Sequence, residues 1–235
     1  MHGEIDMIDA DPQTGLTQLP TQLPAGTAPF DVSRQRARFP FLPQGLFRVW
    51  SDHGLAALAG GRLHLMDPAR LAPLMSHILE GDPDLGSDVA AIAYGNLGEL
   101  VLWSGRHGYG FLSPVLATLE MPNLTAPRPE PPEAQFARQV LQMPAELIEA
   151  FDPDQQPVHD RLVATLGNLP PGAIYGTTPV PPPLGGTPVG HYVVAELMDW
   201  LEAVYTEIGI TLVDWTREPA EIRPVGPPPV PEGTR

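Results

Sequence analysis

Apolar side chains recur every three or four positions in several stretches of the chain, which is the spacing of one helix face. The clearest stretch runs from Val194 to Ile208 and is followed by Gly209, a residue type that commonly ends helices. Shorter stretches with the same spacing are 43–53, 68–79, 136–141 and 158–166. The pattern predicts a helix in each of these segments, with a short turn between residues 144 and 151.

Other segments alternate or cluster apolar residues in the way that β-strands do. The strand candidates are 62–66, 89–94, 99–103, 109–115, 173–176 and 210–215. Short links that contain glycine, at 95–98 and 104–108, favour an antiparallel meander of the three central strands. Because helices accompany antiparallel strands without a βαβ rhythm, we expect an α+β fold built from two mixed modules.

The 31 prolines indicate where these modules begin and end, because proline fixes φ and removes a backbone donor. Prolines concentrate in residues 1–29, 122–132, 179–188 and 217–235. We expect the stretch at 179–188 to be an ordered loop. The expected organisation is a flexible N-terminal segment at 1–29, an α+β domain at 30–121, a linker at 122–132, a second α+β domain at 133–216 and a proline-rich tail at 217–235.

Composition excludes several classes of function. The chain has no cysteine and no lysine, which excludes disulfides, thiolate metal sites and Schiff-base chemistry. Its net charge of −15 argues against direct contact with nucleic acid, and most of that charge falls within residues 122–216. There is no apolar run of membrane-spanning length and no basic, secretory-type N-terminus. We therefore expect an acidic, soluble, cytoplasmic protein that does not bind membranes.

Candidate catalytic chemistry is sparse. The seven histidines show none of the spacings typical of metal sites, and no GxSxG motif is present. His159 and Asp160 are adjacent on a predicted helix, where neighbouring side chains point about 100° apart. We expect no enzyme activity, no metal and no cofactor. An enzyme with a site centred on His107 or His191 stays open as an alternative.

Three sequence motifs resemble those of a known pair of domains. GNLGELVLWSGRHGYGF (95–111) and LPQGLFRVWSDHGLAALAGGRLHLMDP (42–68) resemble the GAD-like domain of bacterial proteins. LGNLPPGAIYGTTPVPPPLGG (166–186) is similar to a motif of the C-terminal domain found beside it, although Thr177 and Thr178 replace the usual aromatic-aliphatic pair. This arrangement resembles type VI secretion system immunity proteins that neutralise a DNase effector.

The resemblance implies a set of residues that maintain the fold. They are Trp103, Gly108, Tyr109, Tyr175, Gly176, Gly185 and Gly186. The tryptophans in apolar segments, Trp50, Trp103, Trp200 and Trp215, are expected in the core. The domain name implies no decarboxylase activity here, since a chain without lysine cannot hold pyridoxal phosphate as an imine.

The resemblance also implies a protein partner, a cognate nuclease toxin. A nuclease that binds phosphates is basic, so an acidic surface would attract it. The acids Glu146, Glu149, Asp152 and Asp154 fall within nine residues beside an apolar stripe, and we expect them to contact the partner. The alternative is a regulatory or scaffold module that binds another protein through the proline-rich sequences PRPEPP (127–132) and GPPPVP (226–231).

Overall fold

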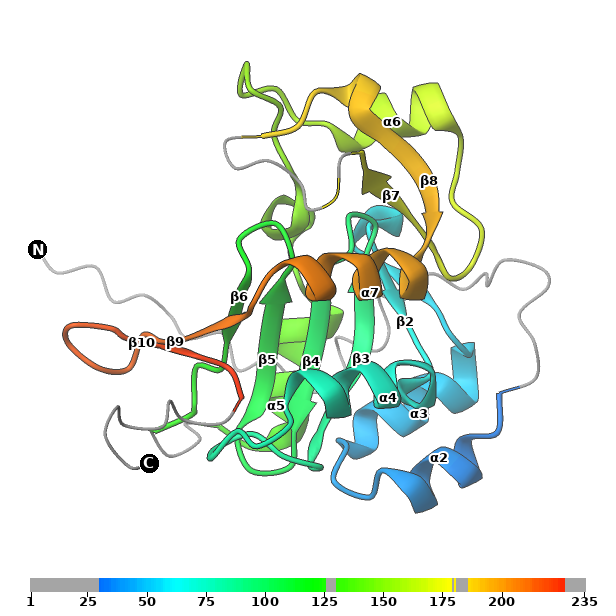
Figure 1. The fold of residues 1–235 in the computed structure, drawn as a ribbon. Coiled ribbons are helices and arrows are strands. Elements are labelled where there is room, and N and C mark those ends of the chain that lie inside the picture. The colour runs from blue at the N-terminus through cyan, green and yellow to red at the C-terminus, as the bar shows by residue number, and fades with distance from the viewer. Residues whose placement is uncertain (1–29, 126–129, 179, 181–185, 227–235) are drawn as a thin grey trace, which may run out of the picture.

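A computed structural model describes residues 30–125, 130–178, 180 and 186–226, and its main feature is an eight-stranded sheet (Figure 1). The strand order is β1-β2-β3-β4-β5-β6-β9-β10, and β7 and β8 form a separate pair. The strands are β1 (Ala57–Leu58), β2 (Leu63–Leu65), β3 (Val89–Gly95), β4 (Leu100–Ser104), β5 (Gly108–Ser113), β6 (Thr118–Glu120), β7 (Ala173–Thr177), β8 (Tyr192–Glu196), β9 (Thr211–Asp214) and β10 (Glu221–Pro224).

Helices account for most of the remaining regular structure, which confirms the α+β class. The α-helices are α2 (Val32–Arg38), α3 (Gln44–His53), α4 (Pro68–Ile78), α5 (Pro132–Phe136), α6 (His159–Leu166) and α7 (Leu197–Glu207). The short turns are η1 (Ala59–Gly61), η2 (Ala137–Leu141), η3 (Ala145–Ile148) and η4 (Val189–His191), of which η2 is π-helical and continues α5. None of the helices in the described ranges is long and apolar enough to cross a membrane.

The predicted meander forms the centre of the sheet. Strands β1 to β6 pair antiparallel in chain order, with Trp103 of β4 opposite Ala90 of β3 and Tyr109 of β5. The chain then leaves the sheet and returns as β9, which pairs with β6 in parallel. The segment expected to lie in the second domain thus extends the sheet that the first domain begins.

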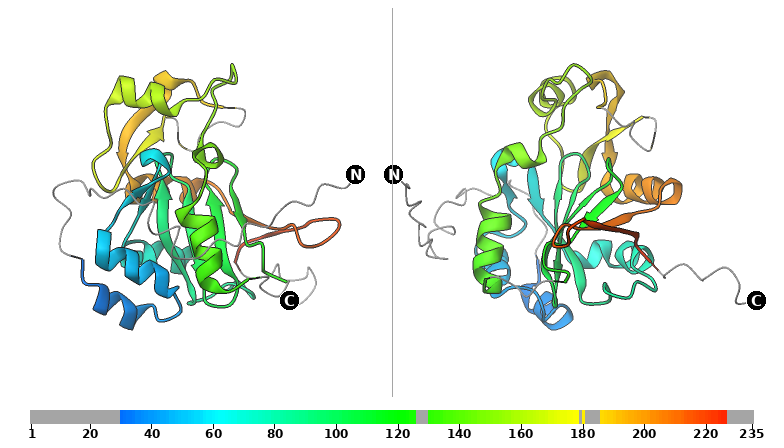
Figure 2. Two further views of the ribbon diagram at one scale, coloured as in Figure 1. Left: turned by 180° about the vertical axis from the view of Figure 1, so that it is seen from behind. Right: turned by 90° about the vertical axis from the view of Figure 1, so that its left-hand side faces the viewer.

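Helices cover both faces of the sheet (Figures 1 and 2). On one face α4 and α7 enclose a core that includes Leu71 and Leu201. On the other face α3, α5 and η2 enclose a core around Trp103, Trp50 and Phe136. Because both faces are covered, every residue of β3 and β4 is buried, which explains the nearly continuous apolar sequence of these strands.

A smaller unit of α6, β7 and β8 lies at one end of the sheet (Figure 1). Its own core contains Val158, Leu162, Tyr175 and Tyr192. Leu97 belongs to the same cluster, although it lies in the turn between β3 and β4. That turn therefore packs the smaller unit against the main sheet.

The C-terminal stretch differs from its expectation as a tail. Residues 221–224 form β10, which pairs antiparallel with β9 at the edge of the sheet. Arg223 on this strand donates hydrogen bonds to Asp82 (2.6 and 3.0 Å) and to Asp84 (2.7 Å). Prolines therefore do not prevent strand formation here, since Pro224 ends an edge strand where its missing N–H is tolerated.

Two further expectations were wrong. The helix expected from Val194 begins only at Leu197, because residues 192–196 pair with β7 as β8 and Glu196 caps the helix. Trp215, expected in the core, is 63% exposed just beyond the end of β9, whereas the other three tryptophans are buried. Helix α2 and strand β6 were not predicted, because their seven and three residues are too few for a clear periodicity.

Candidate partner-binding site

Glu149, one of the four acids expected at a partner interface, has a role inside the protein. It follows the single turn η3, whose Ile148 is buried. The Glu149 Oε1 atom accepts hydrogen bonds from the backbone N–H groups of Val158 (3.1 Å) and His159 (3.0 Å), at the start of α6. Arg62 donates to its other oxygen at 3.4 Å. Glu149 thus caps α6, where a carboxylate stabilises the unpaired N–H groups.

Asp152 is also used internally. Its Oδ1 atom accepts from the backbone N–H groups of Asp154 (3.0 Å) and Gln156 (2.9 Å), and Arg161 donates to Oδ2 at 2.5 Å. The hydrogen bond from Arg161 and those from the backbone hold the pKa of Asp152 below its usual value. The Asp152 side chain is only 7% exposed and holds the loop together through these contacts.

The remaining two acids are exposed and accompany exposed apolar residues. Glu146 and Asp154 both face solvent. Between them in the sequence, Leu147 is 69% exposed and Phe151 is 48% exposed. We call Glu146, Leu147, Phe151 and Asp154 the acidic-apolar segment. It is carried by a loop that Glu149 and Asp152 fix, so its side chains are presented from an ordered backbone.

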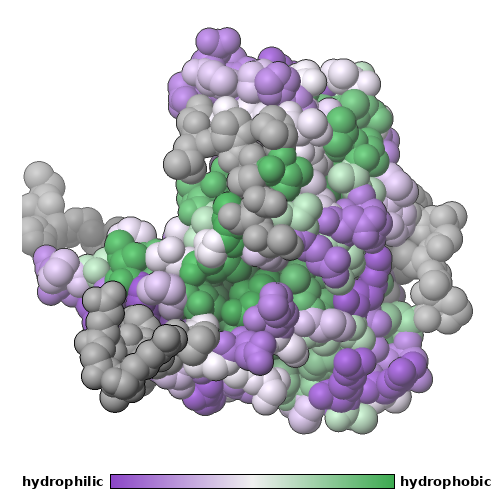
Figure 3. Space-filling model, in the orientation of Figure 1, coloured by the Kyte–Doolittle hydropathy of each residue, from purple (hydrophilic) through white to green (hydrophobic). Residues whose placement is uncertain are grey.

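Apolar exposure continues in the same unit of the molecule. Val193 and Val194 on β8 are 44% and 45% exposed. Figure 3 shows apolar surface over β8. The backbone of Phe151 and Asp152 lies against Gly186, which has a φ of +101° and no room for a Cβ atom. The loop of the acidic-apolar segment is thereby packed against the chain that leads into β8.

A pocket of about 430 Å³ lies beside this loop, where the smaller unit meets the main sheet. Its lining includes Arg62, His64, Asn96, His159 and Asp160. The Asn96 Nδ2 group donates to the carbonyl oxygen of Gly61 (2.9 Å) and to Nε2 of His159 (3.0 Å). The Asn96 Oδ1 atom accepts from Nε2 of His64 at 2.7 Å.

These hydrogen bonds determine which nitrogen of each histidine carries the proton. Because His159 accepts at Nε2, its proton is on Nδ1, which donates to Asp160 at 3.1 Å. Burial lowers the pKa of His64, and the hydrogen bonds to Asn96 and Gly61 only partly offset that effect. The network joins the sheet to α6, and both ring nitrogens of His159 are engaged in it.

The other candidate histidines have different surroundings. The His107 ring lies 3.3 Å from the carbonyl oxygens of both Asn123 and Asp84, and His191 is exposed in the turn η4. Among the residues that the structure describes, no three His, Asp or Glu side chains are placed to hold a metal ion.

The motif residues of the first half, Trp103, Gly108 and Tyr109, make close packing contacts within the fold. Trp103 is fully buried, with its ring 6.4 Å from that of Phe136. Gly108 has a φ of +77°, and the Gln135 side chain lies where a Cβ atom would be. The same Gln135 accepts from the backbone N–H of Tyr109 at 3.2 Å. Burial, and secondarily the charge of Glu120, raises the pKa of Tyr109.

The motif residues of the second half lie at the junction of the two units. Tyr175 is buried, its hydroxyl donates to the Gly167 carbonyl (2.6 Å), and its N–H donates to the Asn96 carbonyl (2.8 Å). Gly176 lies directly against the indole ring of Trp200. Gly185 lies outside the described residues, as do Pro181, Pro182 and Pro183.

Arg62, His64 and Asn96 were not predicted to lie beside His159. These residues come from β2, from the residue before it and from the turn after β3, so no local spacing connects them. Of the residues in this network, only the adjacent pair His159 and Asp160 was noticed in the sequence. Its hydrogen bond forms because the histidine ring is held from its other side by Asn96.

Comparison with known proteins supports the first part of the expected resemblance. The family model of the GAD-like domain matches residues 21–112. Among solved structures, the crystal structure of Atu4351 from Agrobacterium tumefaciens is similar to this fold, with a TM-score of 0.79 and 20% sequence identity. That alignment covers 91% of this chain and 97% of Atu4351. No curated protein matches the chain. A GAD-like domain is thus found at residues 21–112, and nearly the whole chain has the fold of Atu4351.

Proposed function

We propose that the protein is an immunity protein that binds and neutralises a cognate nuclease toxin without catalysing a reaction. The observation that carries this proposal is the acidic-apolar segment. Leu147 and Phe151 are large apolar side chains exposed on an ordered loop, and Glu146 and Asp154 flank them. Protein interfaces combine apolar anchors near the centre with a polar rim, and this segment has both parts.

Charge supports the nature of the partner. A nuclease must be positively charged where it holds the phosphates of its substrate, and this chain has a net charge of −15. Opposite charges accelerate association and orient the two proteins as they meet. The GAD-like domain agrees with the resemblance to type VI secretion immunity proteins, whose second domain carries a motif similar to residues 166–186.

The scaffold alternative depends on PRPEPP and GPPPVP, and most of these two segments lies outside the described residues. No contact in the described parts of the chain favours that alternative.

The decisive experiment uses the nuclease toxin encoded beside this protein, if one is present, and purified full-length chain. The test variant combines Glu146→Arg, Leu147→Ala, Phe151→Ala and Asp154→Arg. The matched control combines Glu80→Arg, Leu116→Ala, Glu218→Arg and Ile222→Ala, since Leu116 and Ile222 are 61% and 65% exposed elsewhere. Both variants change the net charge equally and remove two exposed apolar side chains.

We expect the wild type and the control to inhibit DNA cleavage at a 1:1 ratio with the toxin, and the test variant to lose most of this inhibition. Its association rate should fall, and the salt dependence of that rate should weaken. Full inhibition by a folded test variant would remove the acidic-apolar segment from the interface. Failure of the wild type to inhibit the neighbouring nuclease would overturn the proposed function.

A further inference from the structure

Strand β8 has a free edge. Within the described residues it pairs with β7 alone, and the two strands form a sheet of their own. The other edge of β7 is closed, since the Tyr175 N–H donates to the Asn96 carbonyl oxygen at 2.8 Å. The outer edge of β8 is therefore where this small sheet can accept another strand.

The register of the two strands shows which backbone groups point outward from β8. The Thr178 N–H donates to the His191 carbonyl oxygen at 2.8 Å, so these two residues form a hydrogen-bonded pair. In an antiparallel sheet such pairs alternate with positions whose N–H and C=O groups point away from the partner strand. Val193 and Ala195 therefore direct these groups toward β7, whereas Val194 directs both of its groups outward.

The same alternation applies to the two ends of the strand. The Tyr192 carbonyl oxygen and the Glu196 N–H also point outward, while the Tyr192 N–H donates to the Val189 carbonyl oxygen in η4. Within the described residues no backbone group pairs with these outward groups or with those of Val194. A strand laid along this edge would form hydrogen bonds with both groups of Val194 and with one group at each end.

The side chains along this edge do not prevent pairing. Val193 and Val194 are 44% and 45% exposed, and adjacent residues of a strand face opposite sides of the sheet. An added strand would therefore cover apolar surface on both sides. Edge strands are commonly protected by charged residues or by proline, and residues 192–195 contain neither.

Strand β10, at the edge of the main sheet, has such protection. The Val225 N–H donates to the Ile210 carbonyl oxygen at 2.8 Å, so Ile222 and Pro224 are the positions that point outward. Pro224 has no N–H to offer to a further strand. Strand β1, at the opposite edge, has only two residues. Among the edge strands of the described chain, β8 is therefore the one best able to accept a new strand.

Acidic groups lie at both ends of the β8 edge. At its C-terminal end Asp199 is exposed in the first turn of α7, where the Glu196 carboxylate binds both that turn and Arg70. At its N-terminal end burial raises the pKa of Tyr192, and the negative charge of Asp152 acts in the same direction. The loop that carries the acidic-apolar segment thus lies near the start of β8.

We infer that the outer edge of β8 binds an extended segment of the nuclease toxin, which adds to the sheet of β7 and β8 as a further strand. The inference rests on the proposed function and names how the partner binds. Backbone hydrogen bonds hold the segment, apolar side chains cover Val193 and Val194, and basic side chains meet the acids at the two ends. A second copy of this chain fits less well, because chains of net charge −15 would bring the same acids together.

Hydrogen exchange measured by NMR tests the inference on the wild-type chain, alone and with an equimolar amount of the purified nuclease toxin encoded beside it. In the free chain the N–H of Val194 should exchange rapidly, whereas those of Val193 and Ala195 are bonded to β7 and should exchange slowly. We expect the toxin to slow exchange at Val194 by at least about tenfold and to change that of Val193 and Ala195 little.

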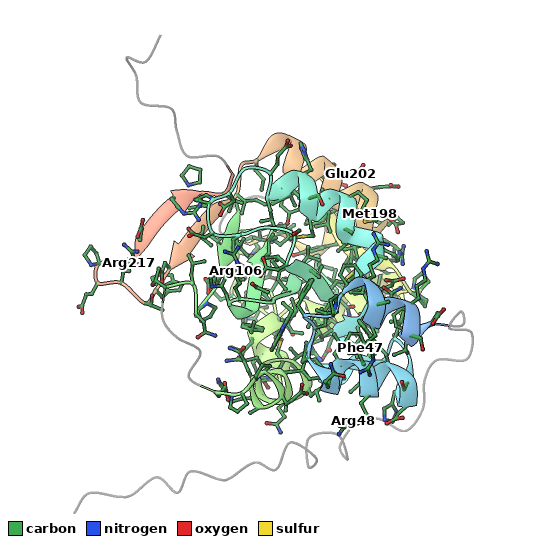
Figure 4. The ribbon with its side chains drawn as sticks, turned by 90° about the horizontal axis from the view of Figure 1, so that it is seen from below. Phe47, Arg48, Arg106, Met198, Glu202 and Arg217 are labelled. Carbon is green, nitrogen blue, oxygen red and sulfur yellow. The ribbon has the colours of Figure 1, made fainter. Side chains whose placement is uncertain are left out.

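A backbone variant tests the same contact by inhibition of DNA cleavage. Val194→Pro removes the outward N–H and leaves the hydrogen bonds to β7 in place. Val194→Thr keeps the N–H and the branched shape, and Ile222→Pro makes the matched change at the edge of β10. Figure 4 shows Arg217, between β9 and β10, on the opposite side of the molecule from Met198, the second residue of α7.

We expect Val194→Pro to bind the toxin at least about tenfold more weakly than the wild type, and both controls to stay within about threefold. Circular dichroism verifies the folds, and the exchange measurement decides if Val194→Pro does not fold. Full inhibition by folded Val194→Pro, or inhibition by the wild type without slower exchange at Val194, would overturn this inference and leave the proposed function standing.

Two other outcomes have different meanings. Slow exchange at Val194 in the free chain, together with a dimer in analytical ultracentrifugation, would overturn the inference in favour of a second copy at this edge. Failure of the wild type to inhibit the toxin would overturn both this inference and the proposed function.

Discussion

The Asn96 side chain donates a hydrogen bond to the buried ring of His159 at 3.0 Å and so joins the turn after β3 to the first residue of α6. The contact spans 63 positions of the sequence. The Asn96 carbonyl oxygen also accepts a hydrogen bond from the Tyr175 N–H, and the Asn96 backbone N–H donates to the carbonyl oxygen of Arg62. One residue therefore connects the main sheet with both α6 and β7 of the smaller unit.

Replacing Asn96 should weaken the attachment of the smaller unit. Asn96→Ala removes three side-chain hydrogen bonds and leaves the Gly61 carbonyl oxygen and the Nε2 atom of His159 without their Asn96 donor. We therefore expect the free energy of unfolding to fall by about 2–4 kcal/mol. Asn168→Ala is the matched control, because Asn168 borders the same pocket but is exposed. Urea denaturation measures both variants. Equal stability of the two would show that the Asn96 network does not stabilise the fold.

Glu99 should make the protein less stable as the pH rises. Burial raises its pKa to about 7, and its Oε2 atom is buried without a hydrogen-bond partner. In the unfolded chain the Glu99 carboxyl group has a pKa near 4.5. The stability that the protonated carboxyl group contributes is therefore fully present below that pH and is lost as the pH rises through about 7. Glu99→Gln should therefore be more stable than the wild type, by roughly 1–3 kcal/mol, near pH 8.

The difference between Glu99→Gln and the wild type should shrink as the pH falls from about 7 and vanish below about pH 4.5, where the Glu99 carboxyl group is protonated in both the folded and the unfolded chain. Chemical denaturation at a series of pH values measures it. A difference that does not change with pH would contradict an ionisation origin.

The contact between Arg223 and Asp82 should make the C-terminal strand necessary for stability. The Asp82 side chain is fully buried and the Arg223 side chain is 23% exposed. Arg223→Ala leaves the Asp82 carboxylate without its cationic partner, and we expect a loss of about 1–3 kcal/mol. Deletion of residues 219–235 should lower the melting temperature further, because it also removes β10.

The same contact predicts acid sensitivity. Burial alone would raise the pKa of Asp82, but the hydrogen bonds from Arg223, and from the N–H groups of Gly226, Asp84 and Leu85, outweigh it and lower the pKa. This contribution to stability is present above the unfolded pKa near 3.8 and is lost as the pH falls through the folded value. Acid denaturation of Arg223→Ala should show a smaller dependence on pH than the wild type in that range.

Truncation to alanine should affect stability strongly at one tryptophan and hardly at all at another. Trp103→Ala leaves a cavity beside Phe136 and should cost about 3–5 kcal/mol. Trp215→Ala removes a side chain that is 63% exposed and should change stability by less than about 0.5 kcal/mol. Thermal melting monitored by circular dichroism distinguishes the two. A melting temperature of Trp103→Ala within a degree of the wild type would contradict the core placement.

Elements with a local pattern could be predicted from the amino-acid sequence. The helices α3, α4 and α6 and the meander from β3 to β5 follow from apolar spacing and from the glycine-containing turns between strands. The motif around Trp103 and Gly108 indicated the GAD-like domain, which the family model matches. These features depend on residues within a few positions of one another, so the periodicity of the chain contains them.

Which acidic side chains are engaged inside the protein and which are exposed depends on the folded chain. Glu149 and Asp152 have the same sequence character as Glu146 and Asp154, but they cap α6 and close a turn, and those roles depend on folding. Likewise Trp215 has an apolar neighbourhood in the sequence, yet it follows the end of β9, where no helix covers it. The parallel pairing of β6 with β9 and the network around Asn96 join residues far apart in the chain. Such contacts depend on burial and on the three-dimensional path of the backbone, which local periodicity does not specify.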